Sequence, residues 1–79
     1  MTGAPWLQLA PLDARVLRAT DAYRERTAER VARMAGCSEE EARRSLKRLR
    51  GKMMIEPDGR RPSGWLRTRR GDLALEHAP

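Results

Sequence analysis

The side chains best suited to binding chemistry in this sequence are the arginines and lysines that follow the acidic run Glu39-Glu40-Glu41. A guanidinium group offers a planar fork of donors that matches phosphate oxygens and paired acceptors, whereas a lysine ammonium acts as a point charge. If this stretch forms a helix, each residue turns its side chain by about 100° around the axis. The side chains that then point most nearly away from the apolar stripe are Glu40, Arg44, Lys47 and Arg48, with Arg43 at its margin.

Positive charge is concentrated around and after these residues. Residues 43–70 contain eleven Lys or Arg against two acidic residues, a net charge of +9. Residues 1–42 carry a net −1 and residues 71–79 a net −2, so the +6 of the whole chain comes from one stretch. Such a stretch favours an anionic partner, most often nucleic acid and less often a membrane surface.

Composition argues against several classes of function. The single Cys37 excludes an internal disulfide, and because His77 is the one histidine, no Cys/His zinc cage can form. The sequence holds no metal-ligand spacing, no phosphate-cradling glycine loop and no catalytic Ser/His/Asp or Cys/His set, so we expect neither an enzyme nor a cofactor. No apolar run approaches the length of a membrane span, and a cytoplasmic, nucleoid-associated protein is expected.

The centre of the chain predicts two helices joined by a tight turn. Thr27 is a good N-cap for a helix over residues 28–35, and Gly36 suits the left-handed residue that ends it. Ser38 and Glu41 have the spacing of a capping box at the start of a second helix. Two helices separated by a short turn that contains Gly form a helix-turn-helix unit. The expected buried stripe of the second helix consists of Ala42, Leu46 and Leu49.

The segment before this unit divides into an arm and a helix. Pro5 and Pro11 bracket residues 1–11, which we expect to form an extended arm. In this arm Trp6 would cover an edge of the core or contact a second copy of the chain. Residues 12–25 predict a first helix with one apolar face. That face would be formed by Leu12, Val16, Leu17, Ala19 and Tyr23.

The basic stretch behind the second helix of the unit predicts a β-hairpin. Residues 53–56 form a short apolar run fit for a strand, and residues 65–68 can form the returning strand. Residues 57–64 between them are rich in turn-forming residues. Arg60 and Arg61 would lie at the tip of this hairpin, which gives it a basic end.

These elements predict a mainly α fold with a small β-hairpin, a three-helix bundle plus a two-stranded wing. The length allows one domain with a small core, which we place at residues 12–76, followed by a tail at residues 77–79. Residues 72–77 predict one terminal turn of helix. Alternation leaves open whether Trp65 or Leu66 points inward.

Three stretches of the chain resemble winged helix-turn-helix transcription regulators of the multiple-antibiotic-resistance repressor type. VLRATDAYRERTAERVARMAGCS resembles the first helix and the T-A-E-x-[VIL]-A-x-x-x-G second helix of that family. EEEARRSLKRLRGKMMIEP resembles a recognition helix and the L-x-x-L-x-x-x-G-x-[IV] entry to the wing, and GWLRTRRGDLAL resembles the strand that leaves it and the L-T-x-x-G close. Met53 stands where the motif has Gly, and Leu66 or Arg67 stands where leucine precedes Thr68. The long dimerisation helices of the family are missing.

The resemblance implies a double-stranded DNA-binding protein whose third helix enters the major groove while its wing touches the backbone or the minor groove. Arg43, Arg44 and Lys47 would then meet base edges or phosphates, with Arg48 on the margin, and Thr27 would donate to a phosphate. The acidic run at the start of the helix would repel phosphates unless it accepts from cytosine amino groups. The residues expected to contact DNA are Thr27, Ser38, Glu40, Arg43, Arg44, Lys47, Arg48, Arg60 and Arg61, the last two from the wing.

Two other interpretations fit the same residues. Glu39–Arg43 and Glu40–Arg44 are both spaced i,i+4, and each pair stabilises an isolated helix by about 0.2–0.5 kcal/mol, so these charges suit an ordinary solvated face. Alternatively, the chain is a winged helix protein–protein interaction module of a larger assembly, which would use the acidic run and Trp6. A homodimer would use the Trp6 arm, the first helix or the C-terminal turn, and neither a membrane nor a small-molecule partner is expected.

Overall fold

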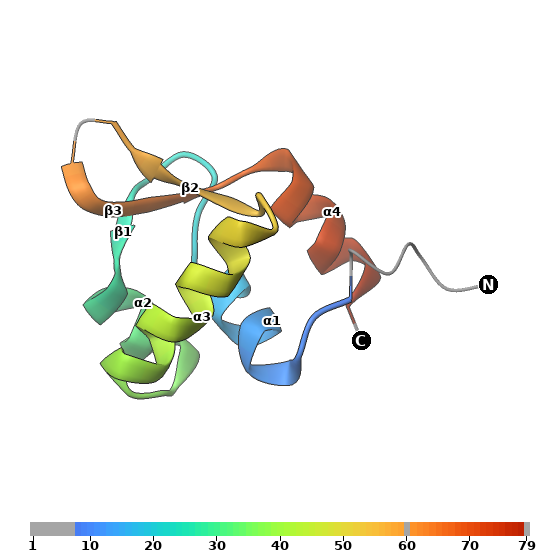
Figure 1. The fold of residues 1–79 in the computed structure, drawn as a ribbon, viewed down its shortest axis with the longest axis horizontal. Coiled ribbons are helices and arrows are strands. Elements are labelled where there is room, and N and C mark those ends of the chain that lie inside the picture. Colours follow the sequence, from blue (N-terminus) through green and yellow to red (C-terminus); the bar gives the residue numbers. More distant parts are fainter. Residues whose placement is uncertain (1–7, 60, 79) are drawn as a thin grey trace.

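The computed structural model describes residues 8–59 and 61–78, with the backbone alone at residues 61–63. Within these residues four helices and three strands follow one another along the chain (Figure 1). They are α1 (Pro11–Arg18), β1 (Arg26–Thr27), α2 (Ala28–Ala35), α3 (Glu39–Gly51), β2 (Ile55–Asp58), β3 (Arg61–Arg67) and α4 (Arg69–His77).

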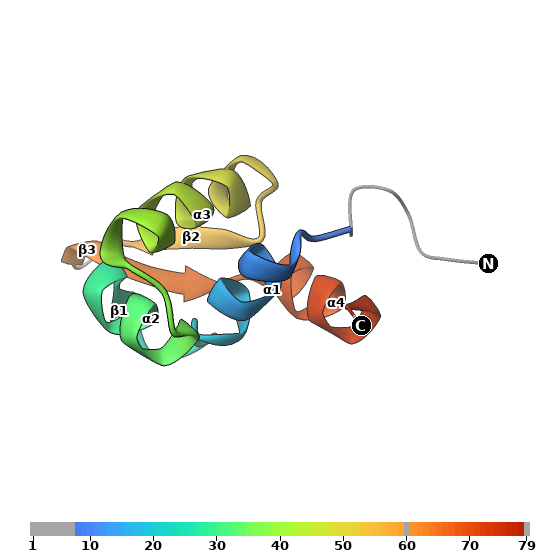
Figure 2. The same cartoon turned by 90° about the horizontal axis from the view of Figure 1, so that it is seen from below.

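The three strands form one antiparallel sheet in the order β1-β3-β2. Figure 1 shows this sheet beside α2 and α3, with α4 beyond the end of the sheet that lies away from the β2–β3 turn. Seen from the direction of Figure 2, α1 lies between the α2–α3 pair and α4. The described part of the chain is therefore mainly helical with a small antiparallel sheet, as the sequence predicts, and the arrangement is compatible with that of a winged helix.

Strand β1 is the element that the sequence did not predict. Arg26 pairs with Trp65 and Thr27 pairs with Gly64 across the sheet. The guanidinium of Arg26 also donates to the carbonyl of Ala19 at 2.9 Å, which holds the strand against the end of α1. A strand of two residues is too short to show the alternation from which strands are predicted. The two predicted strands therefore belong to a sheet of three in the described residues.

Helix α1 ends at Arg18 and not at residue 25, so the prediction of its length is wrong. Thr20 Oγ1 donates to a carbonyl of the last helical turn at 2.6 Å. The carboxylate of Asp21 then accepts two amides of the following loop, that of Tyr23 and that of its neighbour, each at 2.8 Å. Asp and Thr side chains compete with the helical backbone in this way. The predicted core position of Tyr23 is also wrong, because its side chain is 93% exposed.

The caps of α2 and α3 are confirmed. Thr27 Oγ1 accepts from the amide of Arg30 at 3.2 Å. Gly36 ends α2 with φ 71° and ψ 39°, the left-handed conformation that glycine adopts without a steric penalty. Ser38 and Glu41 each accept the backbone amide of the other, at 3.1 and 3.0 Å, and so complete the predicted capping box. These local bonds fix the turn between the two helices.

The core lies where α1, α2 and α3 meet the sheet and α4. The predicted stripe of Ala42, Leu46 and Leu49 on α3 is confirmed, because all three side chains are buried. Trp65 and Leu75 are partly buried and pack against this core. The buried apolar cluster consists of Val16, Leu17, Ala19, Ala28, Val31, Leu46, Leu49, Met54, Ile55 and Ala74.

The hairpin is shifted from its predicted position. Strand β2 begins at Ile55 rather than at residue 53, and β3 begins at Arg61 rather than at residue 65. Met53 explains the first difference, because its φ of 59° places it in the left-handed region and turns the chain between α3 and β2. The strand can begin only after this turn.

Helix α4 begins at Arg69 rather than at residue 72, because Thr68 caps it. Thr68 Oγ1 accepts from the amide of Gly71 at 3.2 Å and donates to the carbonyl of Met53 at 2.7 Å. One hydroxyl therefore starts the last helix and ties it to the turn that precedes β2. The sequence predicted only one turn of this helix, at residues 72–77, and not its cap.

Replacing Met53 with glycine is expected to raise the free energy of unfolding by about 0.5 kcal/mol. A left-handed conformation costs an ordinary residue about 1–2 kcal/mol, and the extra unfolded-state freedom of glycine cancels part of this gain. The Met53 side chain is 62% exposed, so its loss removes little packing. Urea unfolding measures the difference. Met34→Gly in α2 is the matched control and should lose about 0.5–1 kcal/mol, and equal losses at both positions would refute the strain at Met53.

Candidate nucleic-acid interface

The exposed surface of α3 has three sides that differ in what they face. One side points away from the rest of the fold, a second points toward β3, and a third points toward α1. We call them the outward side, the groove side and the α1 side. The outward side carries Glu40 and Arg44, the groove side carries Arg43, Lys47 and Arg50, and the α1 side carries Arg48.

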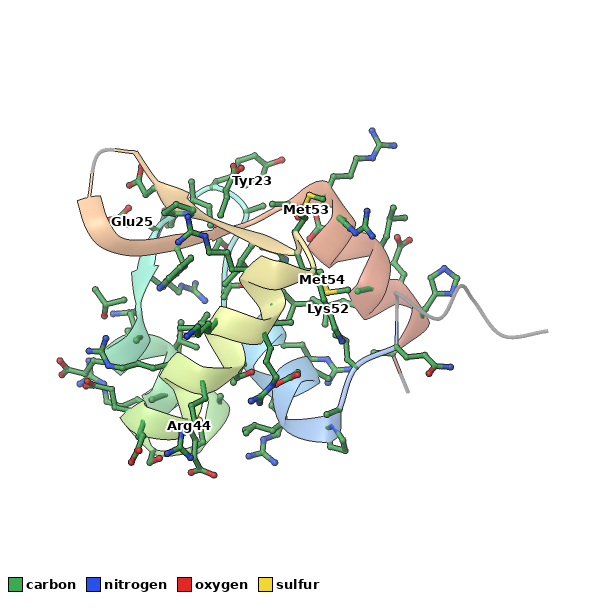
Figure 3. The ribbon with its side chains drawn as sticks, in the orientation of Figure 1. Tyr23, Glu25, Arg44, Lys52, Met53 and Met54 are labelled. Atoms are coloured by element: carbon green, nitrogen blue, oxygen red, sulfur yellow. The ribbon has the colours of Figure 1, made fainter. Side chains whose placement is uncertain are left out.

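The outward side is dominated by one ion pair. Arg44 Nη2 lies 2.6 Å from Glu40 Oε1, and about seven tenths of each side chain is exposed. Figure 3 shows Arg44 on the part of α3 that lies farthest from the sheet. Exposed pairs of this kind contribute only about 0.2–1 kcal/mol, because water and salt screen them. Both groups can therefore exchange partners at small cost.

The groove side forms a hollow between α3, the start of α2 and β3. Its volume is about 330 Å³, and its lining consists of Ala28, Arg43, Leu46, Lys47, Arg50 and Trp65. The floor is apolar and the rim is basic. The guanidinium carbon of Arg50 lies over the Trp65 ring, 5.8 Å from its centre, within the range of a cation–π contact.

The basic side chains on the groove side differ in their partners. Arg43 donates to Glu39 Oε2 with two nitrogens, at 2.7 and 3.0 Å. Among the side chains that the structure describes, Lys47 and Arg50 are the bases of α3 that form no ion pair. Their charge is therefore available to an external anion without the loss of an internal ion pair.

The α1 side is occupied by a buried carboxylate. Asp13 is 2% exposed and accepts from Ser45 Oγ at 2.6 Å. Arg48 donates to both of its oxygens, at 2.8 and 3.2 Å, and remains half exposed. In the structure this carboxylate joins α1 to α3 and directs Arg48 toward α1.

Asp13 should make the stability of the fold depend on pH. Burial raises the pKa of Asp13, but hydrogen bonds from Arg48 and Ser45 and the charge of Arg48 outweigh it, so the pKa lies below its ordinary value of 3.8. A depressed folded-state pKa stabilises the fold above the unfolded-state pKa, and this contribution disappears as the pH falls through the folded-state value.

Asp13→Asn is therefore expected to lose about 1.5–3 kcal/mol of unfolding free energy at pH 7, the range for hydrogen bonds to charged groups. The wild type and the variant should converge as the pH falls below about 4. Asp21 and Glu41 also have lowered pKa values, and comparison with the variant at each pH removes their contribution. Urea unfolding between pH 7 and pH 2 measures the difference. A gap that stays constant with pH would show that the charge of Asp13 is not involved.

The other predicted contact residues have distinct positions. Thr27 is exposed at the start of α2, next to Ala28, which lines the groove. Ser38 is exposed at the start of α3, where its hydroxyl takes part in the capping box. Arg60 and the side chain of Arg61 lie outside the described residues, as does the Trp6 arm.

The structure thus brings Glu40, Arg43, Arg44 and Lys47 together on the exposed surface of α3 and turns Arg48 aside. Sequence reasoning missed Arg50 and Trp65. The spacing of Arg50 from Arg43 and Lys47, at i+7 and i+3, could have placed it on the same side. The position of Trp65 could not be found, because it depends on the pairing of β3 with β1.

Comparison of the chain with protein-family models, curated proteins and solved structures found no significant match. None of the helices in residues 8–59 and 61–78 is both long enough and apolar enough to cross a membrane. In the same residues, no three His, Cys, Asp or Glu side chains are grouped to hold a metal ion. The chemistry that the described surface supports is the binding of anions by guanidinium and ammonium groups beside an aromatic ring.

Proposed function

We propose that this chain is a winged helix-turn-helix domain that binds double-stranded DNA sequence-specifically, as a small transcription regulator. In this proposal α3 enters the major groove, and the basic β2–β3 hairpin contacts the backbone or the minor groove. The observation that carries it is the row of Arg43, Lys47 and Arg50 beside Trp65, next to the exposed Arg44. These residues place positive charge along one continuous surface of a single helix.

The order of the elements supports the fold assignment. A helix, a short strand and a helix-turn-helix precede a hairpin, and the strand β1 pairs with the hairpin strand β3. The turn at Gly36 and the capping box at Ser38 make the start of α3 rigid. An α-helix with its side chains is about 10–12 Å wide, close to the roughly 12 Å of the major groove.

The exposed ion pairs of α3 do not prevent this function. An Arg that forms two hydrogen bonds to a guanine edge contributes about 1–3 kcal/mol of discrimination, which exceeds the value of an exposed ion pair. Arg44 can therefore leave Glu40 for a base, and Glu40 can then accept from a cytosine amino group. Lys47 and Arg50 would supply phosphate contacts that do not depend on sequence.

The salt dependence of binding tests the proposal. Affinity for a duplex of random sequence should fall as salt is added. The slope of log K against log salt should be about −3 to −4 if four basic side chains of α3 each neutralise one phosphate. Fluorescence anisotropy of a labelled duplex measures this slope. Arg33→Ala is a control variant that should leave this slope nearly unchanged, because Arg33 lies exposed on α2 and does not line the groove. A slope near zero in the wild type would contradict DNA binding.

A protein-interaction module is the second candidate, and exposed apolar side chains favour it. Tyr23, Met53 and Leu73 are exposed, and Figure 3 shows Tyr23 and Met53 on the part of the fold opposite Arg44. A partner protein that still binds after Arg43, Arg44, Arg60 and Arg61 are all replaced by alanine would support this function. Loss of duplex binding in that variant, with no protein partner retained, would support the DNA-binding function.

A further inference from the structure

We propose that Arg50 and Trp65 form a clamp that holds one unpaired nucleobase, so that the protein prefers duplex DNA with an unpaired nucleotide to fully paired duplex. The proposal deepens the function proposed above and rests on it. It adds a second recognition element, because the outward side of α3 would read paired bases while the groove side would hold an unpaired base.

The spacing of the two side chains carries the inference. The guanidinium of Arg50 lies over the Trp65 ring at 5.8 Å from its centre. Two flat groups in direct contact would lie closer, and stacked bases are about 3.4 Å apart along a DNA strand. A base between the two planes needs twice that separation, about 6.8 Å. The 5.8 Å joins the guanidinium carbon to the ring centre and includes any sideways offset, so the guanidinium has to move outward by at least about 1 Å to admit one base.

The two walls of the gap differ in their freedom to move. Trp65 is partly buried and packs against the core, and its backbone pairs with strands on both sides. Arg50 is exposed in the last turn of α3, and no carboxylate among the described side chains holds it. The ring is thus a fixed platform and the guanidinium a movable cover. Aromatic rings and guanidinium planes are both groups on which unpaired bases stack.

The surroundings of the gap suit a nucleotide better than a peptide side chain. The hollow of about 330 Å³ lies at the lower end of the roughly 300–1,000 Å³ found for small-ligand sites, enough for a base but not for a duplex. Ala28 and Leu46 give it an apolar floor. Lys47 and Arg43 stand on the rim about one and two helical turns from Arg50, where the phosphates that flank an unpaired base would lie.

Fluorescence of Trp65 and the affinity for matched duplexes test the clamp. Trp6→Phe leaves Trp65 as the one tryptophan of the chain, since the sequence contains two. In this background, a random-sequence duplex is compared with the same duplex carrying one unpaired thymine. The second duplex should bind about tenfold tighter, the order expected for one stacked base, and should quench Trp65 more strongly.

Two substitutions separate the clamp from general charge. Arg50→Lys keeps the charge but removes the flat guanidinium, and it should abolish most of the preference for the duplex with the unpaired thymine. Trp65→Phe keeps a ring and should retain part of the preference. Arg33→Lys on α2 is the matched control and should leave the preference unchanged. Circular dichroism of each variant confirms that it is folded.

Four results would overturn the clamp. Equal affinities for the two duplexes would remove it while leaving duplex binding intact, and no binding of either duplex would remove both proposals. A preference that survives Arg50→Lys would show that only charge is involved. Quenching of Trp65 by a polyglutamate peptide, without quenching by the unpaired thymine, would assign the groove to an acidic protein segment instead.

Discussion

Gly71→Ala is expected to destabilise the domain by about 3 kcal/mol or more, the upper part of the range for overpacking. A Cβ at this position would lie 2.3 Å from the carbonyl oxygen of Met54 and 2.8 Å from Cγ of Arg67. The first contact is to backbone, which cannot move aside without separating α4 from the turn before β2. Alanine is the better helix former by about 1 kcal/mol, but this gain is smaller than the cost of the clash.

The measured effect should be a large fall in the melting temperature. In a domain of this size 1 kcal/mol corresponds to about 4–8 °C, so we expect a loss of roughly 12–24 °C or no cooperative transition at all. Gly51→Ala is the matched control. A Cβ on Gly51 meets no atom within 4 Å, and this substitution at the end of α3 should be neutral or slightly stabilising. Equal effects of the two substitutions would contradict the packing of α4.

Lys47→Glu is expected to reduce duplex affinity by about 100-fold at low salt while leaving the domain folded. Lys47 is exposed on α3 and lines the groove. Replacing an attraction to phosphate with a repulsion near a protein surface changes the binding energy by about 2–3 kcal/mol. The slope of log K against log salt should also become shallower by about 0.9, the value for one phosphate contact.

Arg33→Glu controls for net charge, because it changes the charge of the chain by the same amount at an exposed position on α2. We expect it to weaken binding by only a few-fold through the general field of the protein. Thermal melting of both variants checks that they remain folded. Equal losses of affinity in Lys47→Glu and Arg33→Glu would show that α3 is not the contact surface.

The parts of the fold that sequence predicted well are held by local bonds. The start of α2 at Thr27, its end at Gly36 and the capping box of Ser38 and Glu41 all join residues a few positions apart. Such bonds leave a pattern in the sequence, because each requires a particular residue type at a particular spacing. The buried stripe of α3 was predictable for the same reason.

The parts that were missed depend on contacts between distant residues. The end of α1 is fixed partly by Arg67, whose guanidinium donates to the carbonyls of Leu17 and Thr20 and to Asp72. No local pattern in the sequence reveals that the Arg67 side chain hydrogen-bonds to the end of α1 rather than pointing into solvent. Strand β1 was missed likewise, because two residues become a strand only when β3 lies beside them.

The candidate site, like the fold, was predictable only where it depends on local spacing along the chain. The basic and acidic positions of α3 follow from helical periodicity, and the two i,i+4 ion pairs are present as the spacing indicates. The commitment of Arg48 to Asp13 and the contact of Arg50 with Trp65 were not predictable, since each joins α3 to another element. These contacts determine which basic side chains of α3 remain available to an anion.

Selection of bound sequences from a random pool of duplex DNA tests the proposed function most directly. The wild-type protein should enrich a short motif, and Arg44→Ala should lose affinity for that motif more than for unselected duplex, because base contacts specify and phosphate contacts do not. Enrichment of no motif by the wild type would contradict sequence-specific DNA binding by α3.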